Sequence, residues 1–121
     1  MSKLTKLQVT MLEDRLSLDD CLIEAMRDTY QTDGIPMPSD AEIASAFRQV
    51  SALLEAADLS HVTTMTTTAR WVLADCYDGS TWCDRADSAR ACGEISEAKF
   101  RAEVRSFEQL GDKLATAGID T

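Results

Sequence analysis

Apolar residues recur every three or four positions in several separate segments, which is the spacing of a buried helix face. The clearest stripe consists of Ile43, Ala46, Phe47, Val50, Leu53, Leu54 and Ala57. Ser39 and Glu42 precede it in the order of a capping box, in which the serine oxygen accepts a hydrogen bond from a backbone N–H of the first turn. This pattern predicts a helix over about 39–57.

A second stripe lies in a segment that is rich in threonine. It consists of Val62, Met65, Ala69, Val72, Leu73 and Cys76, and it stops near Gly79. Five of the residues in 63–68 are threonines, whose β-branched side chains lose rotamer freedom in a helix. We therefore expect a helix here whose first turn is frayed or irregular.

The C-terminal stripe follows Ser96 and consists of Phe100, Val104, Phe107, Leu110 and Leu114. Gly118 stands where a left-handed residue closes a helix, and Ile119 is placed to contact Leu114, as in a Schellman motif. Residues 78–94 are ambiguous: 84–91 contain alanines and could form a short helix that ends at Gly93.

The N-terminal third holds more helix-start signals than one helix can use. Capping boxes are suggested at Thr5-x-x-Gln8, Thr10-x-x-Glu13 and Ser17-x-x-Asp20. Apolar spacing favours helices over about 4–14 and 17–31 and leaves open whether they fuse. Two prolines and a glycine in 31–38 then predict a loop.

These patterns together predict an all-α fold, because no segment alternates apolar and polar residues with a period of two. We expect a compact bundle of four to five helices that forms a single domain over 1–121. The predicted core includes Phe47, Val50, Leu54, Leu73, Phe107 and Leu114.

Charge narrows the classes of function. The 121 residues include 21 acids and 12 bases, for a net charge of −9, which argues against direct binding of nucleic acid or of an anionic membrane. One histidine and the absence of nucleophile-elbow or glycine-rich phosphate motifs argue against most enzyme classes. We therefore expect a protein that is not an enzyme and holds no cofactor.

The four cysteines do not suggest a zinc site. Cys76, Cys83 and Cys92 are far apart in sequence, whereas structural zinc sites use close pairs. Cys76 falls on an apolar stripe and is expected to be a buried thiol. No apolar signal-peptide region or membrane-spanning stretch is visible, so we expect reduced thiols and a cytoplasmic location.

Two pairs of acids resemble fragments of the motif of the all-α nucleotide pyrophosphohydrolases. The pairs are Glu94-x-x-Glu97 and Glu55-x-x-Asp58. In that family the E-x-x-E pair comes first, whereas here the order is reversed and the separation differs. Both pairs also straddle predicted helix ends, so we do not expect a magnesium site from them.

The remaining acids gather in two clusters. In the first, Asp20, Glu24 and Asp28 recur every four residues and line a helix face opposite Leu22 and Met26. The second cluster, near Trp82, consists of Asp75, Asp78, Asp84 and Asp87. Either cluster can be a docking surface for a basic partner or a solvated face that keeps the protein soluble.

We expect a small acidic interaction protein that docks on a basic, nucleic-acid-binding partner and inhibits it as a nucleic-acid mimic. In size and charge it resembles phage and plasmid anti-defence proteins of the anti-restriction and anti-CRISPR type. The candidate partner-binding residues are Asp20, Glu24, Asp28, Asp78, Asp84 and Trp82, with Tyr77 as a further aromatic anchor. The alternatives are a bundle that binds a small ligand or metal between its helices, and a small acidic chaperone or adaptor.

Overall fold

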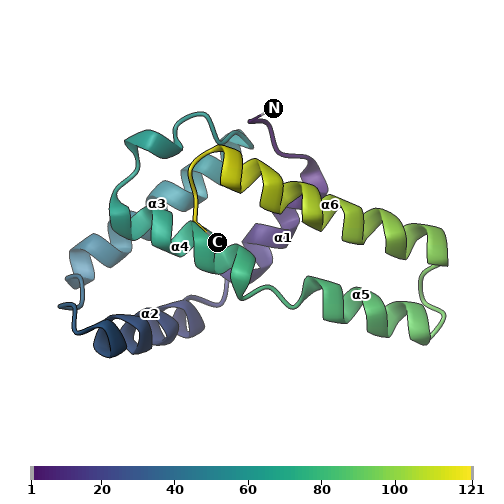
Figure 1. The fold of residues 1–121 in the computed structure, drawn as a ribbon, viewed down its shortest axis with the longest axis horizontal. Helices are drawn as coiled ribbons and strands as arrows, with labels where there is room; N and C mark the ends of the chain where they lie inside the picture. Colours follow the sequence, from purple (N-terminus) through teal and green to yellow (C-terminus); the bar gives the residue numbers. More distant parts are fainter. Residues whose placement is uncertain (1, 121) are drawn as a thin grey trace.

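The computed structural model describes residues 2–120, and the fold there is all-α, as predicted (Figure 1). Its elements are α1 (Lys6–Leu16), α2 (Asp19–Asp33), α3 (Asp40–Ala56), a 3₁₀ turn η1 (Val62–Thr64), α4 (Thr67–Asp78), α5 (Trp82–Ala91) and α6 (Glu97–Thr116). Pairing of the β type is limited to one isolated antiparallel bridge between Lys3 and Asp58 within this part of the chain.

The two N-terminal segments remain separate helices. Thr5 and Gln8 form the capping box of α1, in which Gln8 N donates to Thr5 Oγ1 at 3.2 Å and Thr5 N donates to Gln8 Oε1 at 3.0 Å. Ser17 does not cap α2, because its hydroxyl donates to Asp14 O at the end of α1. Leu18 then leaves the helical conformation with φ −94° and ψ 57°, and α2 starts after it.

The predicted break between the second and third helices is confirmed, although α2 extends to Asp33, into the segment 31–38 that was expected to be a loop. Gly34 takes the left-handed conformation after α2, with φ 69°, and Ser39 Oγ accepts the Glu42 N–H at the start of α3. The threonine-rich segment begins as η1, and a new cap at Thr66 starts α4. The irregular first turn that was expected there is therefore a separate 3₁₀ turn.

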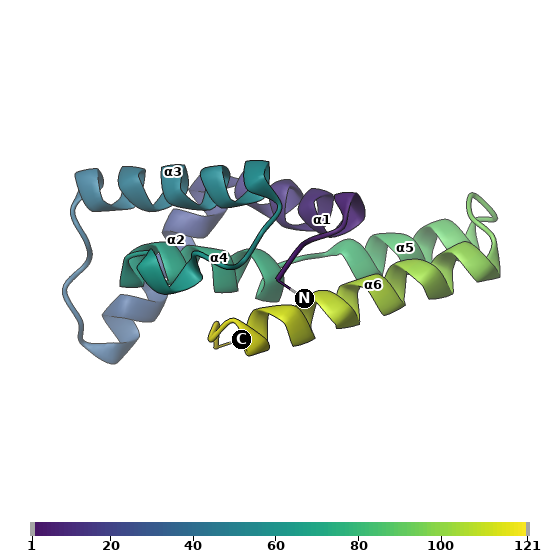
Figure 2. The same ribbon diagram turned by 90° about the horizontal axis from the view of Figure 1, so that it is seen from above.

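The body of the molecule is a bundle of α1–α4 with the C-terminal half of α6. α3 packs along α4, and α1 contacts α2, α3, α4 and α6 (Figures 1 and 2). The predicted core residues that are buried are Val50, Leu54, Leu73 and Leu114. Phe47 and Phe107 were also predicted to be buried, but this was wrong, since both are only partly buried. Phe47 lies at the edge of a groove, and Phe107 stacks on Tyr77.

α5 and α6 form a hairpin that extends beyond this body (Figure 2). Within α5 only Ala86 is buried, and within α6 only Leu110 and Leu114, both near the C-terminal end. The Schellman closure predicted for α6 is confirmed: Gly118 has φ 92°, and the N–H of the buried Ile119 donates to Leu114 O at 2.9 Å.

Candidate functional site

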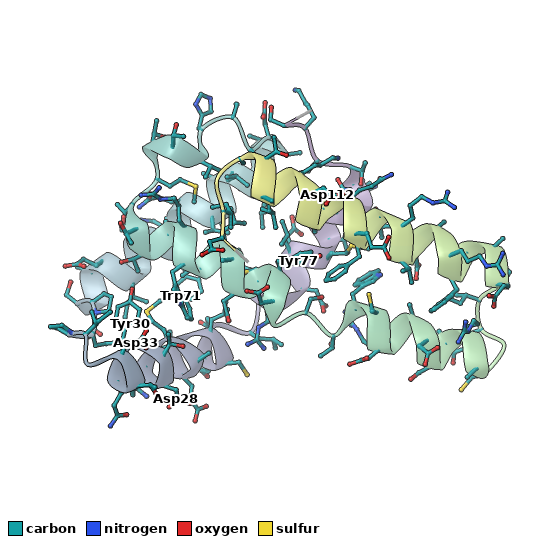
Figure 3. The ribbon with its side chains drawn as sticks, in the orientation of Figure 1. Asp28, Tyr30, Asp33, Trp71, Tyr77 and Asp112 are labelled. Carbon is teal, nitrogen blue, oxygen red and sulfur yellow. The ribbon has the colours of Figure 1, made fainter. Side chains whose placement is uncertain are left out.

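The acidic row, defined here as Asp20, Glu24 and Asp28, runs along the exposed side of α2. All three side chains are exposed, whereas Leu22 and Met26 on the opposite side of the helix are 0% exposed. Figure 3 shows Asp28 pointing away from the body of the molecule. At a helical rise of 1.5 Å per residue, the carboxylates are spaced roughly 6 Å apart along the axis.

The helix that carries the row is held against the body by its other side. Tyr30 of α2 meets Trp71 of α4 edge-to-face, with ring centroids 6.3 Å apart and an interplanar angle of 90° (Figure 3). Aromatic pairs of this geometry stabilise a contact beyond the area that they bury. The row is therefore presented on an anchored helix.

No ion pair neutralises the acidic row within residues 2–120. The nearest arginine in sequence before α2, Arg15, lies against α4 and pairs with Asp75 at 3.4 Å. The ion pairs that do form are concentrated on α5 and α6, where Arg85 pairs with Asp14, and Arg90 pairs with Asp87.

The second acidic cluster is divided and partly neutralised. Asp78 and Asp84 are exposed at the end of α4 and the start of α5, whereas Asp75 and Asp87 are already paired with arginines. Partial desolvation of its carboxyl group, followed by repulsion from Asp75 and Asp120, raises the pKa of Asp78 above its usual value. This cluster carries less free negative charge per residue than the acidic row.

The two candidate aromatic anchors are used within the fold. Trp82 is partly buried, and the Arg85 guanidinium lies 5.1 Å from its ring centroid. Tyr77 stacks on Phe107 with centroids 4.4 Å apart, and its hydroxyl donates to Phe107 O at 3.4 Å (Figure 3). In both ribbon views α2 and α5 lie toward opposite ends of the molecule, so the two candidate surfaces are separate.

A groove between α2 and α3 was not predicted from the sequence. It has a volume of about 680 Å³ and is lined by residues of both helices, by Leu16 and Ser17 before α2, and by Met37 and Pro38 before α3. Both helices pack on α1 and α4, but α2 and α3 do not pack along each other, so a groove remains between them. The available signal was Ile23, which extends the apolar side of α2 beyond Leu22 and Met26.

For the alternative of a ligand site between the helices, the candidate lining residues are the threonines of 63–68, Tyr77 and the two pairs of acids, and these do not converge. Tyr77 lies ten residues along α4 from Thr67, which is roughly 15 Å of helix. His61 is exposed beside a smaller hollow of about 330 Å³ that contains none of the paired acids except Asp58. Across residues 2–120, no group of three or more His, Cys, Asp and Glu side chains is arranged to hold a metal ion.

In each of the two sequence pairs of acids, one member makes contacts within its own segment of the fold. Glu97 pairs with Arg90 and Arg101, while Asp58 Oδ1 accepts the Ser60 N–H at 2.9 Å. That backbone hydrogen bond is the main cause of the lowered pKa of Asp58. Neither pair forms a cluster suited to magnesium in the described chain.

The four cysteines are free thiols in very different environments. Cys76 is buried, as predicted, and this burial raises its pKa to about 12. Cys21 and Cys92 are exposed, and Cys83 is intermediate, with a pKa raised first by burial and then by Asp84 and Glu108.

Comparison with protein family models, curated proteins and solved structures finds no significant match to this chain. Among the helices of residues 2–120, none has both the length and the apolar character of a membrane span. The functional assignment therefore depends on the geometry and charge of the surfaces described above.

Proposed function

We propose that this protein is a non-enzymatic docking protein whose acidic row binds a basic surface of a partner protein. The observation that supports the proposal is the exposure of three unpaired carboxylates at regular spacing on a helix anchored by Tyr30 and Trp71. A row held on a folded helix binds without a large ordering cost, and its field accelerates the approach of a cationic partner.

The partner class that suits this surface is a nucleic-acid-binding protein. Its lysines and arginines are placed to bind phosphates, and carboxylates at the same site compete with the nucleic acid for those cations. Docking of this kind inhibits the partner, which is the mode of action that the resemblance in size and charge to anti-defence proteins suggests. Exposed free thiols at Cys21 and Cys92 are consistent with a reducing, cytoplasmic environment.

The test requires a purified partner, which affinity capture from the native host and mass spectrometry can identify. Its binding is then measured at two salt concentrations with wild-type protein and with the variant Asp20→Lys, Glu24→Lys, Asp28→Lys. We expect the variant to lose at least about tenfold in affinity, mainly through the association rate, with a smaller difference at high salt.

A matched control separates the effect of the acidic row on binding from the effect of net charge. The variant Glu94→Lys, Glu108→Lys, Asp112→Lys changes the same number of exposed acids on α6 and just before it. We expect it to retain most of the affinity. Equal losses in both variants, or unchanged affinity in the acidic-row variant, would contradict the proposal, and Asp78 and Asp84 would be tested next.

A further inference from the structure

We propose, resting on the proposed function, that the partner docks a basic amphipathic helix into the groove between α2 and α3. The groove would hold the apolar side of that helix, and the acidic row would hold its lysines or arginines. This assigns a binding mode and a ligand class to a surface that charge alone does not define.

The groove has the dimensions of a short helix. Its α2 wall is formed by residues four apart, from Asp19 through Ile23 to Arg27. Its α3 wall extends from Asp40 to Ser51. At 1.5 Å per residue these walls are roughly 12 and 16 Å long, which accommodates about two to three helical turns.

The groove is apolar at its centre and along its ends. Ile23, Phe47 and Met37 are partly buried and line it. Among residues 2–120, the large apolar side chains that are well exposed are Leu18, at 49%, and Ile35, at 52%. Leu18 lies between the lining residues Ser17 and Asp19, and Ile35 lies two residues before the lining residue Met37, so uncovered apolar surface concentrates around the groove.

The charge around the groove is complementary to a cation. Asp19 and Asp40 line it, and Arg27 is the cation among the lining residues. The acidic row follows the lining positions of α2 by one residue, about 100° around the helix, so it flanks the groove on the solvent side. On α3 the exposed Arg48 and Glu55 offset each other. A helix with basic residues beside its apolar stripe can therefore bind the apolar groove and the acidic row at the same time.

A helix suits this groove better than an extended segment or a second copy. A helix satisfies its own backbone hydrogen bonds, whereas an extended peptide needs a strand edge, and residues 2–120 contain no sheet. Two copies that met through this face would bring their acidic rows together, and the chain already carries a net charge of −9.

The probe is a fluorescent synthetic peptide of about 14 residues, with leucines on one helical face and lysines elsewhere. A second peptide has the same composition with its leucines scattered around the helix. Binding is measured by anisotropy, and NMR amide shifts of the labelled protein locate the peptide. We expect the amphipathic peptide to bind at least about tenfold more tightly than the scattered one, with shifts along α2 and α3.

Groove-filling variants test the site directly. Ala44→Trp and Ser51→Trp each place an indole in the groove from an exposed position of α3. Ala102→Trp places the same side chain on an exposed position of α6, away from the groove. We expect the first two to weaken peptide binding by about tenfold or more and the third to change it less than about twofold. Circular dichroism confirms that each variant is folded.

The outcomes separate this inference from the proposed function. Equal binding of the two peptides, or equal affinity of the Ala44→Trp and Ala102→Trp proteins for the amphipathic peptide, would overturn the inference that the groove binds a helix. This holds even if the acidic-row variant loses its partner. A dimer of the protein alone that Ala44→Trp dissociates would assign the groove to a second copy and would also overturn the inference. Loss of peptide binding in the groove variants, with the partner still bound by the acidic-row variant, would instead overturn the proposed function.

Discussion

Tyr77 connects α4 to α6 through a contact that depends on a glycine. Its ring stacks on Phe107 with an interplanar angle of 11°. Gly111, one turn further along α6, leaves room for the phenol: a Cβ atom there would lie 2.5 Å from the Tyr77 hydroxyl oxygen. The absence of a side chain at this position therefore allows the close approach of the two helices.

The substitution Gly111→Ala tests this contact. Replacing a glycine within a helix by alanine usually stabilises it by about 1 kcal/mol. Here we expect a loss of about 1–2 kcal/mol in the free energy of unfolding, because the stacked ring must move. Urea denaturation measures it. In a Tyr77→Ala background the same substitution should stabilise the protein, and stabilisation in the wild-type background would contradict the proposed steric role.

Thiol reactivity tests the burial of the cysteines. With an aromatic disulfide reagent at pH 8, Cys21 and Cys92 should react first because they are exposed. Cys83 should follow more slowly. Cys76 should react only on unfolding, since burial raises its pKa to about 12 and leaves almost no thiolate. Mass spectrometry of timed samples assigns each site; early modification of Cys76 would show that α4 is not buried as described.

At the scale of the elements, helix starts and ends were the most predictable features. Ser39 and Thr5 cap their helices through side-chain contacts within the same turn, and Gly118 closes α6 locally. Such signals depend on residues a few positions apart, so they can be recognised in the sequence. α3 accordingly begins and ends within one residue of its predicted bounds.

The packing between elements was less predictable. Nothing local indicates that Ser17 bonds to the end of α1 rather than capping α2, or that α2 and α3 do not pack along each other. Phe47 shares its stripe with Val50 and Leu54, yet it faces the groove, because burial depends on which neighbour covers each side of a helix. The exposed acidic row of α2 could be predicted from the helical period alone. The groove beside it could not, because it depends on how the helices pack in three dimensions.

The unequal burial of two predicted core residues, Leu73 of α4 and Phe47 of α3, can be measured. Leu73→Ala removes a fully buried side chain and should cost about 3–5 kcal/mol in the free energy of unfolding. Phe47→Ala removes a larger side chain that is only partly buried, and we expect a loss of about 1–2 kcal/mol. Both values come from denaturant titration with equal m-values as the control. A larger loss at Phe47 than at Leu73 would contradict the groove-edge position.

At the scale of the whole molecule, paired and unpaired charges are segregated. α5 and α6 supply most of the arginine–carboxylate pairs, while α2 carries carboxylates without such partners in residues 2–120. Exposed pairs of this kind contribute little to stability, at most about 1 kcal/mol each. Their main effect is on the local charge: acids and bases balance along α5 and α6, whereas acids outnumber bases along α2.

The two ends of α6 lie in different environments. The C-terminal part of α6 holds Leu110 and Leu114 in the core, whereas the part near Glu97 has only α5 beside it. Backbone amides in solvent deuterium should therefore exchange in a gradient along α6, fastest near Glu97 through local opening and slowest around Leu114, where exchange requires global unfolding. Opening of the hairpin leaves α2 and α3 intact, so the molecule can lose order at one end while the opposite end keeps its shape.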